Sequence, residues 1–254
     1  MLTRLLLRLP GGAGPRRYRL WLGVFLAVLL AWSGLFALAA GPDPLCGPAR
    51  IAALPLGGLP VLLAMWALMA AAMMLPTLGP TLAAWADLPP RAGADSAGAL
   101  ALVWGYLAVW LLASLGFALA QMLLVHFGAL GPLGALTDPR AAAALLLAAG
   151  LWQFTRAKTA CQIACLTPSG YFLGRFRPGR RGAVRMGVEI GLACIGCCWA
   201  LMALAFVGGA MSLGFMGLAT LFMVLEKLPA LGLRLRRPAG AALIATAAFT
   251  VFGG

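Results

Sequence analysis

Long uncharged stretches separated by short basic segments are the feature that most constrains the fold of this chain. Residues 20–42, 51–86 and 190–225 contain no Asp, Glu, Lys or Arg. A helix needs about 20 apolar residues to cross a bilayer core of about 30 Å. A membrane barrel needs short segments that alternate apolar and polar residues, whereas these stretches are continuous in Ala, Leu and Met. The sequence therefore predicts an all-α, polytopic integral membrane helix bundle.

The overall composition supports the same fold class. Hydrophobic residues make up 63% of the 254 residues and charged residues only 10%, whereas a soluble domain averages about 25% charged residues. The formal net charge is +13, but the basic residues lie between the apolar stretches, where they orient a protein in the membrane. We therefore expect a lipid bilayer, and no nucleic acid, as the partner of the basic residues.

Seven transmembrane helices account for the apolar stretches. Pro76 and Pro80 are expected to end the second helix, and Asp138 with Pro139 is a helix N-cap followed by a proline in the first turn. That fourth helix is expected to continue unbroken to about Cys165. The expected spans are about 20–40, 56–75, 98–124, 139–160, 186–207, 211–226 and 238–252, within one bundle covering 20–254.

The distribution of Lys and Arg predicts the orientation. With the N-terminus inside, the cytoplasmic segments hold 17 of these residues and the external segments hold two, Arg50 and Arg140. Such asymmetry follows the positive-inside rule. We expect residues 1–19 to form a basic cytoplasmic N-terminus and the C-terminus to lie outside.

The fifth span carries the most informative side chains. Cys194, Cys197 and Cys198 are spaced i, i+3 and i+4, so they share one helix face, and Met202 extends that face. Soft sulfur ligands select copper(I), zinc or iron–sulfur clusters. A lone Cys is usually an inert, buried apolar residue, but three on one face favour a metal site. If they bind metal, this face must point toward the second span and the end of the fourth.

Further sulfur ligands come from two other segments. Cys161 and Cys165 are spaced i, i+4, one turn after Lys158, whose charge would favour their thiolates; a ligand pair and two unrelated interfacial cysteines are equally compatible with this spacing. Met69 and Met73 recur on one face of the second span, and Met74 follows. Such methionines are commonly flexible packing residues, but they end on the same side of the membrane as Cys161 and Cys165.

Two carboxylates lie within or at the end of spans. Glu189 is one turn inside the fifth span, within reach of Arg185, and Glu226 followed by Lys227 closes the sixth. Ionisable groups inside a membrane are costly and are therefore functional candidates. No catalytic triad, phosphate-binding loop or zinc-protease motif is present, so hydrolase and nucleotide-dependent functions are unsupported and we name no catalytic residue.

Several motifs together resemble a bacterial family of predicted metal-binding integral membrane proteins, some of them labelled copper chaperones. The motifs are MAAAMMLP (69–76), GYLAVW (105–110), Trp152-Gln153 with Lys158 and the Cys161/Cys165 pair, GCCWALM (196–202), GGAMSLGFM (208–216) and Glu226-Lys227. The chain departs from the family pattern at Trp152, Ala164 and Leu166. The resemblance implies a metal-binding protein of the bacterial inner (cytoplasmic) membrane, with copper as the metal.

Three functions are compatible with these residues. The first is handling of copper(I) by Cys194, Cys197, Cys198, Cys161, Cys165, Met69, Met73, Met74 and Met202, with Glu189, Glu226, Lys227 and Lys158 as supporting charges and a metal-donor or metal-acceptor protein as a partner. The second is a membrane thiol oxidoreductase, in which the cysteine pairs exchange electrons. The third is a structural or assembly subunit with inert cysteines.

Overall fold

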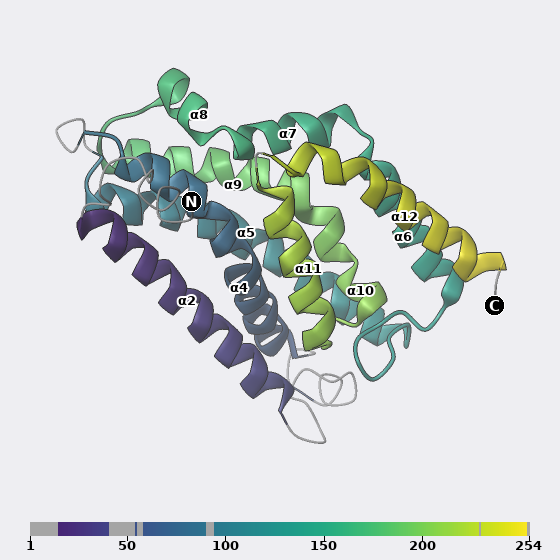
Figure 1. Cartoon of the computed structure of the whole chain (residues 1–254). Helices are drawn as coiled ribbons and strands as arrows, with labels where there is room; N and C mark the ends of the chain where they lie inside the picture. Colours follow the sequence, from purple (N-terminus) through teal and green to yellow (C-terminus); the bar gives the residue numbers. More distant parts are fainter. Residues whose placement is uncertain (1–14, 41–53, 55–57, 90–93, 229, 253–254) are drawn as a thin grey trace, which may run out of the picture.

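The computed structural model describes residues 15–40, 54, 58–89, 94–228 and 230–252, and in this part of the chain the all-α prediction is confirmed (Figure 1). Only an isolated β-bridge between Leu130 and Leu136 departs from it there. Cys46 and most of the basic N-terminus lie outside the described residues. The helices are α2 (Pro15–Ala39), α4 (Leu59–Ala86), α5 (Ser96–His126), α6 (Pro139–Gln153), α7 (Arg156–Leu166), α8 (Pro168–Arg175), α9 (Gly179–Ala203), α10 (Ala205–Gly208), α11 (Leu213–Glu226) and α12 (Gly232–Phe252).

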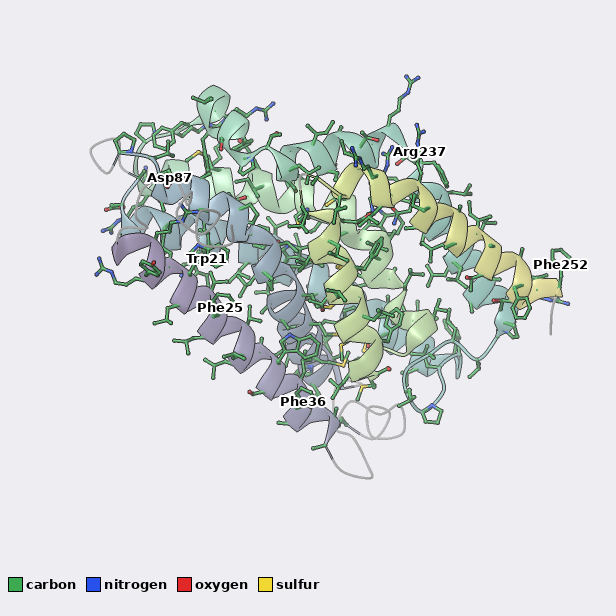
Figure 2. All side chains as sticks on the ribbon, viewed as in Figure 1. Trp21, Phe25, Phe36, Asp87, Arg237 and Phe252 are labelled. Carbon is green, nitrogen blue, oxygen red and sulfur yellow. The ribbon has the colours of Figure 1, made fainter. Side chains whose placement is uncertain are left out.

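Among the described residues, four helical segments are long and apolar enough to cross a membrane. They are Arg17–Ala39, Leu59–Ala86, Ser96–His126 and Gly179–Gly208, and α11 is a shorter apolar helix. Few residues of the segments in α2 and α5 are buried, and large apolar side chains such as Leu30 and Leu112 lie on the outside; Figure 2 shows Trp21, Phe25 and Phe36 along α2. These helices are compatible with a membrane protein, and the count of seven spans and the orientation stay predictions.

Helix α4 corrects the expectation that Pro76 and Pro80 end the second span. Both prolines lie inside this helix, which continues to Ala86. The hydroxyls of Thr77 and Tyr106 both donate hydrogen bonds to the Met74 carbonyl, at 2.8 and 3.0 Å. The Tyr106 bond ties α4 to α5 beside the two prolines, and membrane helices commonly retain prolines where neighbouring helices support them.

The fourth predicted span is two helices rather than one. Helix α6 ends at Gln153 and α7 begins at Arg156. Thr155 separates them because its hydroxyl accepts a hydrogen bond from the Lys158 backbone N–H (3.2 Å) and donates one to the Trp152 carbonyl (2.8 Å). A threonine at this position caps the second helix and stops the first. The predicted cap at Asp138 is confirmed, since its carboxylate accepts from the Arg140 N–H at 2.9 Å.

Close contact between α5 and α9 fixes the position of the cysteine-bearing helix. A side chain at Gly105 would clash with the Val184 carbonyl, and one at Gly187 would clash with the Leu102 carbonyl. Small residues at such crossings let two helix backbones approach directly. Helix α9 therefore lies against α5 (Figure 1). Its cysteine face contacts α4 at Thr77, α7 at Cys165 and the end of α11 at Lys227.

Candidate metal centre

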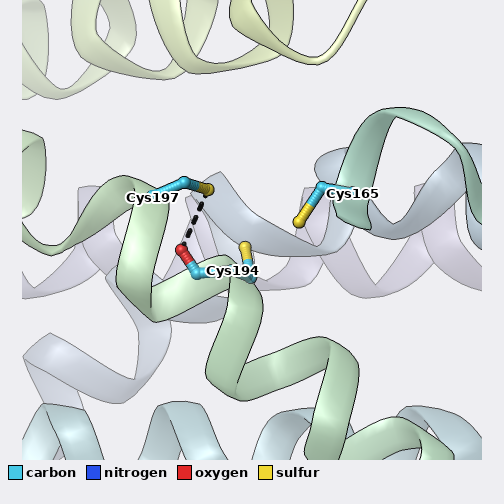
Figure 3. A group of neighbouring side chains, drawn as sticks. All are labelled: Cys165, Cys194 and Cys197. Atoms are coloured by element: carbon cyan, nitrogen blue, oxygen red, sulfur yellow. Dashed lines mark hydrogen bonds between the residues drawn. The ribbon is translucent and has the colours of Figure 1, made fainter. Parts of the chain in front are cut away.

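Three cysteine sulfurs from two helices form a group that could hold a metal ion. The Sγ atoms of Cys165 in α7 and of Cys194 and Cys197 in α9 all lie within 4.8 Å of one another, and all three residues are buried. Figure 3 shows the three thiols between the two helices, together with the hydrogen bond from Cys197 Sγ to the Cys194 carbonyl at 3.2 Å. The three cysteines are free thiols. The α9 face thus points into protein, as expected for a metal site.

The other two predicted cysteine ligands lie next to this group but outside it. Cys198 is buried, and its Sγ is 3.2 Å from the Cys197 Sγ. Cys161 is half-buried, and its sulfur occupies the space that a side chain at Gly196 would fill. Gly196 therefore lets α7 pack closely on α9, which brings Cys165 to Cys194 and Cys197. Burial raises the pKa of the Cys161 thiol, which opposes the expectation that Lys158 would favour its thiolate.

A buried lysine at the end of α11 supplies positive charge to the sulfurs. The Lys227 ammonium is 3.0 Å from the Cys197 Sγ and 3.8 Å from the Cys194 Sγ, and the residue is only 5% exposed. An ammonium in contact with sulfur stabilises the thiolate, which is the form that binds metal. The sequence placed Lys227 among the supporting charges, and the structure puts it at the thiols themselves.

Two hydroxyls that sequence reasoning missed complete the surroundings of Cys194. The Tyr106 hydroxyl lies 3.2 Å and the Thr77 hydroxyl 3.8 Å from the Cys194 Sγ. Both residues are buried. Their signal was present in the sequence, because each is a polar side chain within a long apolar stretch.

The four predicted methionine ligands are all buried in the same hydrophobic core as the thiols. Met74 is linked to the group through its backbone. Its carbonyl accepts hydrogen bonds from the Thr77 and Tyr106 hydroxyls, which also contact the Cys194 sulfur. Met69, Met73 and Met202 are each at most 2% exposed. Their role as ligands stays a prediction.

The chain is similar to a family of known description. The family described as PpoB2, copper chaperone, matches residues 63–250, about three quarters of the chain. The chain belongs to the PpoB2 copper chaperone family. The resemblance inferred from the sequence motifs is thereby confirmed. No curated protein and no solved structure matches the chain.

The region matched by the family includes all five cysteines around the centre, and also a buried ion pair beside it. The Lys158 ammonium is 3.0 Å from both carboxylate oxygens of Glu226, and the two side chains are 0% and 3% exposed. Gln162 donates to the Glu226 backbone carbonyl at 3.1 Å. These contacts join α7 to the end of α11, so they hold Cys165 and Lys227 in place from one side.

Glu189, the remaining predicted supporting charge, contacts α8 and the segment after it rather than the thiols. Its carboxylate lies 2.7 Å from both the Tyr171 hydroxyl and the Arg177 guanidinium, and 3.6 Å from the Arg185 Nε. The predicted reach to Arg185 is therefore confirmed. Burial and the bond to Glu189 raise the pKa of Tyr171 above its ordinary value, so Tyr171 stays a hydrogen-bond donor that fastens α8 to α9.

Proposed function

We propose that this protein is a membrane copper chaperone that holds one copper(I) ion between Cys165, Cys194 and Cys197 and passes it to a partner protein. The observation that carries the proposal is the group of three buried thiols within 4.8 Å. Membership of a copper chaperone family supports copper as the metal. Thiolates are soft ligands, which favour the monovalent ion of copper.

The sulfur separations suit metal–thiolate bonds. In zinc–thiolate sites the metal–sulfur distance is about 2.3 Å, so two sulfurs on opposite sides of an ion with similar bonds lie about 4.6 Å apart. Three sulfurs within 4.8 Å of one another can therefore surround an ion after small side-chain shifts. A tetrahedral zinc site requires a fourth ligand, whereas copper(I) is satisfied by the three sulfurs in this group.

Charge balance in the buried site supports the same assignment. Two thiolates and one copper(I) ion carry a net charge of −1, which the Lys227 ammonium, 3.0 Å from Cys197 Sγ, neutralises. Burying an uncompensated charge costs several kcal/mol, so a neutral assembly is strongly favoured. The third cysteine then coordinates as a thiol or joins the thiolates when the ion changes ligands.

Copper content of the purified full-length protein tests the proposal. Cys165→Ser, Cys194→Ser and the double variant Cys197→Ser/Cys198→Ser are each expected to lose bound copper, because a hydroxyl is a poor ligand for a soft ion. Cys161→Ser is the matched control inside the fold and Cys46→Ser the control elsewhere; both are expected to retain copper. The measurement is copper per protein after anaerobic loading in reductant, against a competing copper(I) chelator.

Two results would contradict the proposal. The parent protein could carry no copper after loading, or the serine variants could bind as much as the parent. A protein that cycles a disulfide reversibly while retaining no copper would instead be a thiol oxidoreductase.

The location of the proposed site follows from the predicted topology. With the N-terminus in the cytoplasm, the end of α11 and all of α7 lie at the cytoplasmic side of the bacterial inner membrane, so the partner protein would meet the thiols there. A reporter that is active only after export is expected to be active when fused after Gly254. The same reporter inserted between Arg175 and Arg185 is expected to be inactive, and an active fusion there would reverse the orientation.

A further inference from the structure

A second group of sulfur side chains lies at the opposite end of the bundle from the thiols. Met65 near the start of α4, Met211 before α11 and Met216 in its first turn line one small cavity against the end of α2. The three methionines are 2%, 7% and 2% exposed. The cavity has a volume of about 10 Å³, close to that of one water-sized sphere.

The backbone around Met211 is fixed by hydrogen bonds. Its N–H donates to the Leu133 carbonyl at 3.0 Å, and the preceding turn depends on Gly209, whose φ of +92° favours glycine. Ser212 then caps α11 by accepting a hydrogen bond from the Phe215 N–H at 3.3 Å. Met211 and Met216 are therefore brought to the same cavity by an ordered reversal.

We infer that Met65, Met211 and Met216 form a second binding site for a soft monovalent metal ion, such as copper(I) or silver(I). The inference rests on the proposed function of the thiol centre. The remaining lining of the cavity is leucine and alanine, so its side chains offer no oxygen or nitrogen to a hard cation. Thioether sulfur is a ligand that soft ions accept and hard ions do not.

A buried methionine stripe on α4 runs from the cavity toward Thr77. Met65, Met69 and Met73 are spaced four residues apart on α4, so they share a face and advance by about 6 Å per step, and all three are buried. From Met65 to Thr77, which touches Cys194, is roughly 18 Å along the helix at 1.5 Å per residue. Thioethers are uncharged, whereas thiolates neutralise the charge of the ion. The thiol centre is therefore expected to bind the ion more tightly than the methionine site.

Titration of the full-length protein with silver(I), a soft ion that is not oxidised in air, tests the second site. The parent is expected to bind two ions. The variant Met65→Leu/Met211→Leu/Met216→Leu is expected to bind one, because leucine preserves volume but offers no sulfur. Met186→Leu, which changes a buried methionine of α9 outside the cavity, is the matched control and is expected to bind two.

A variant without the thiol centre separates the two sites. Cys165→Ser/Cys194→Ser/Cys197→Ser is expected to retain one ion whose affinity is equal at pH 6 and pH 8, because a thioether has no proton to release on binding. The ion at the thiol centre is expected to bind more weakly at pH 6, because cysteines must lose protons to bind metal.

The failures of the two proposals are distinguishable. A triple-leucine variant that still binds as many ions as the parent overturns the second site, and so does a parent that binds a single ion lost in the triple-serine variant. A triple-serine variant that binds as many ions as the parent instead overturns the thiol centre. If the triple-leucine variant does not stay monodisperse, Met216→Leu alone is measured, and an unchanged stoichiometry and affinity overturn the second site.

Discussion

Two buried lysines lie close to the thiol centre, and they differ in what neutralises them. Lys158 is fully buried and faces both carboxylate oxygens of Glu226 at 3.0 Å. Lys227, the residue next to Glu226, is 5% exposed and donates its hydrogen bonds to the sulfurs of Cys197 and Cys194. No carboxylate of the described residues lies within salt-bridge distance of Lys227.

The difference indicates separate roles for the two lysines. Glu226 and Lys158 form a buried ion pair at 3.0 Å, so the charge of Lys158 is balanced within the pair. A free thiol is mostly protonated at neutral pH, so the sulfurs balance the charge of Lys227 only when they become thiolates. Lys158 thus holds α7 to α11 as a structural pair, whereas Lys227 favours the chemical state in which the cysteines bind metal.

The largest expected effect comes from breaking the structural pair. Glu226→Gln leaves the Lys158 ammonium buried without an opposite charge, and loss of one partner of a buried pair costs about 3–5 kcal/mol. We expect the free energy of unfolding in detergent to fall by about that amount. Chemical unfolding followed by tryptophan fluorescence measures it.

Asp87→Asn is the matched control for this substitution. Its pair with Arg17 spans 3.5 Å, and the Asp87 side chain is 65% exposed, so its loss is expected to cost about 1 kcal/mol or less. If the two substitutions lowered the free energy of unfolding equally, the Lys158–Glu226 pair would contribute no more to stability than the Arg17–Asp87 pair.

The next effect concerns Lys227. Lys227→Met removes the positive charge beside Cys197 while keeping a long apolar side chain. We expect copper(I) affinity to fall by roughly 10–100-fold, the usual result of removing a group that supports a metal ligand. Competition with a copper(I) chelator under reducing conditions measures the change.

Arg185→Met provides the control, because it removes a cation from the same helix as Cys194 and Cys197 but at an exposed position. We expect copper affinity to be unchanged. A Lys227→Met variant with the affinity of the parent would mean that Lys227 has no part in the metal centre, and the contrast between the two lysines would then fail.

The cysteine face was predictable from sequence because it depends on local helical spacing. The i, i+3, i+4 positions of Cys194, Cys197 and Cys198 place three sulfurs together in any α-helix, and the structure buries that face. The apolar stretches likewise predicted the helices. The turn before α11 also depends on local chemistry, because Gly209 adopts a positive φ and Ser212 caps the helix.

The partners of the cysteines were not predictable, because they depend on contacts between distant segments. Lys158 lies one turn from Cys161 in sequence, and it was expected to activate that thiol. The fold instead pairs Lys158 with Glu226, 68 residues away, and brings Lys227 to Cys197 across 30 residues. The break at Thr155 changes the direction of the helix axis between α6 and α7, and residue spacing in the sequence does not give the size of that change.

The smallest expected effect comes from removing the structural pair as a whole. In Lys158→Met/Glu226→Leu both charges are replaced by apolar side chains of similar size. Replacement of a buried ion pair in this way is often neutral or stabilising, so most of the stability lost in Glu226→Gln should return. Copper affinity should stay within a few-fold of the parent, because Lys227 and the three thiols are unchanged. The same unfolding and chelator-competition measurements apply. A double variant that folds normally but no longer binds copper would show that the pair contributes charge to the metal centre, and the two lysines would then act as one unit.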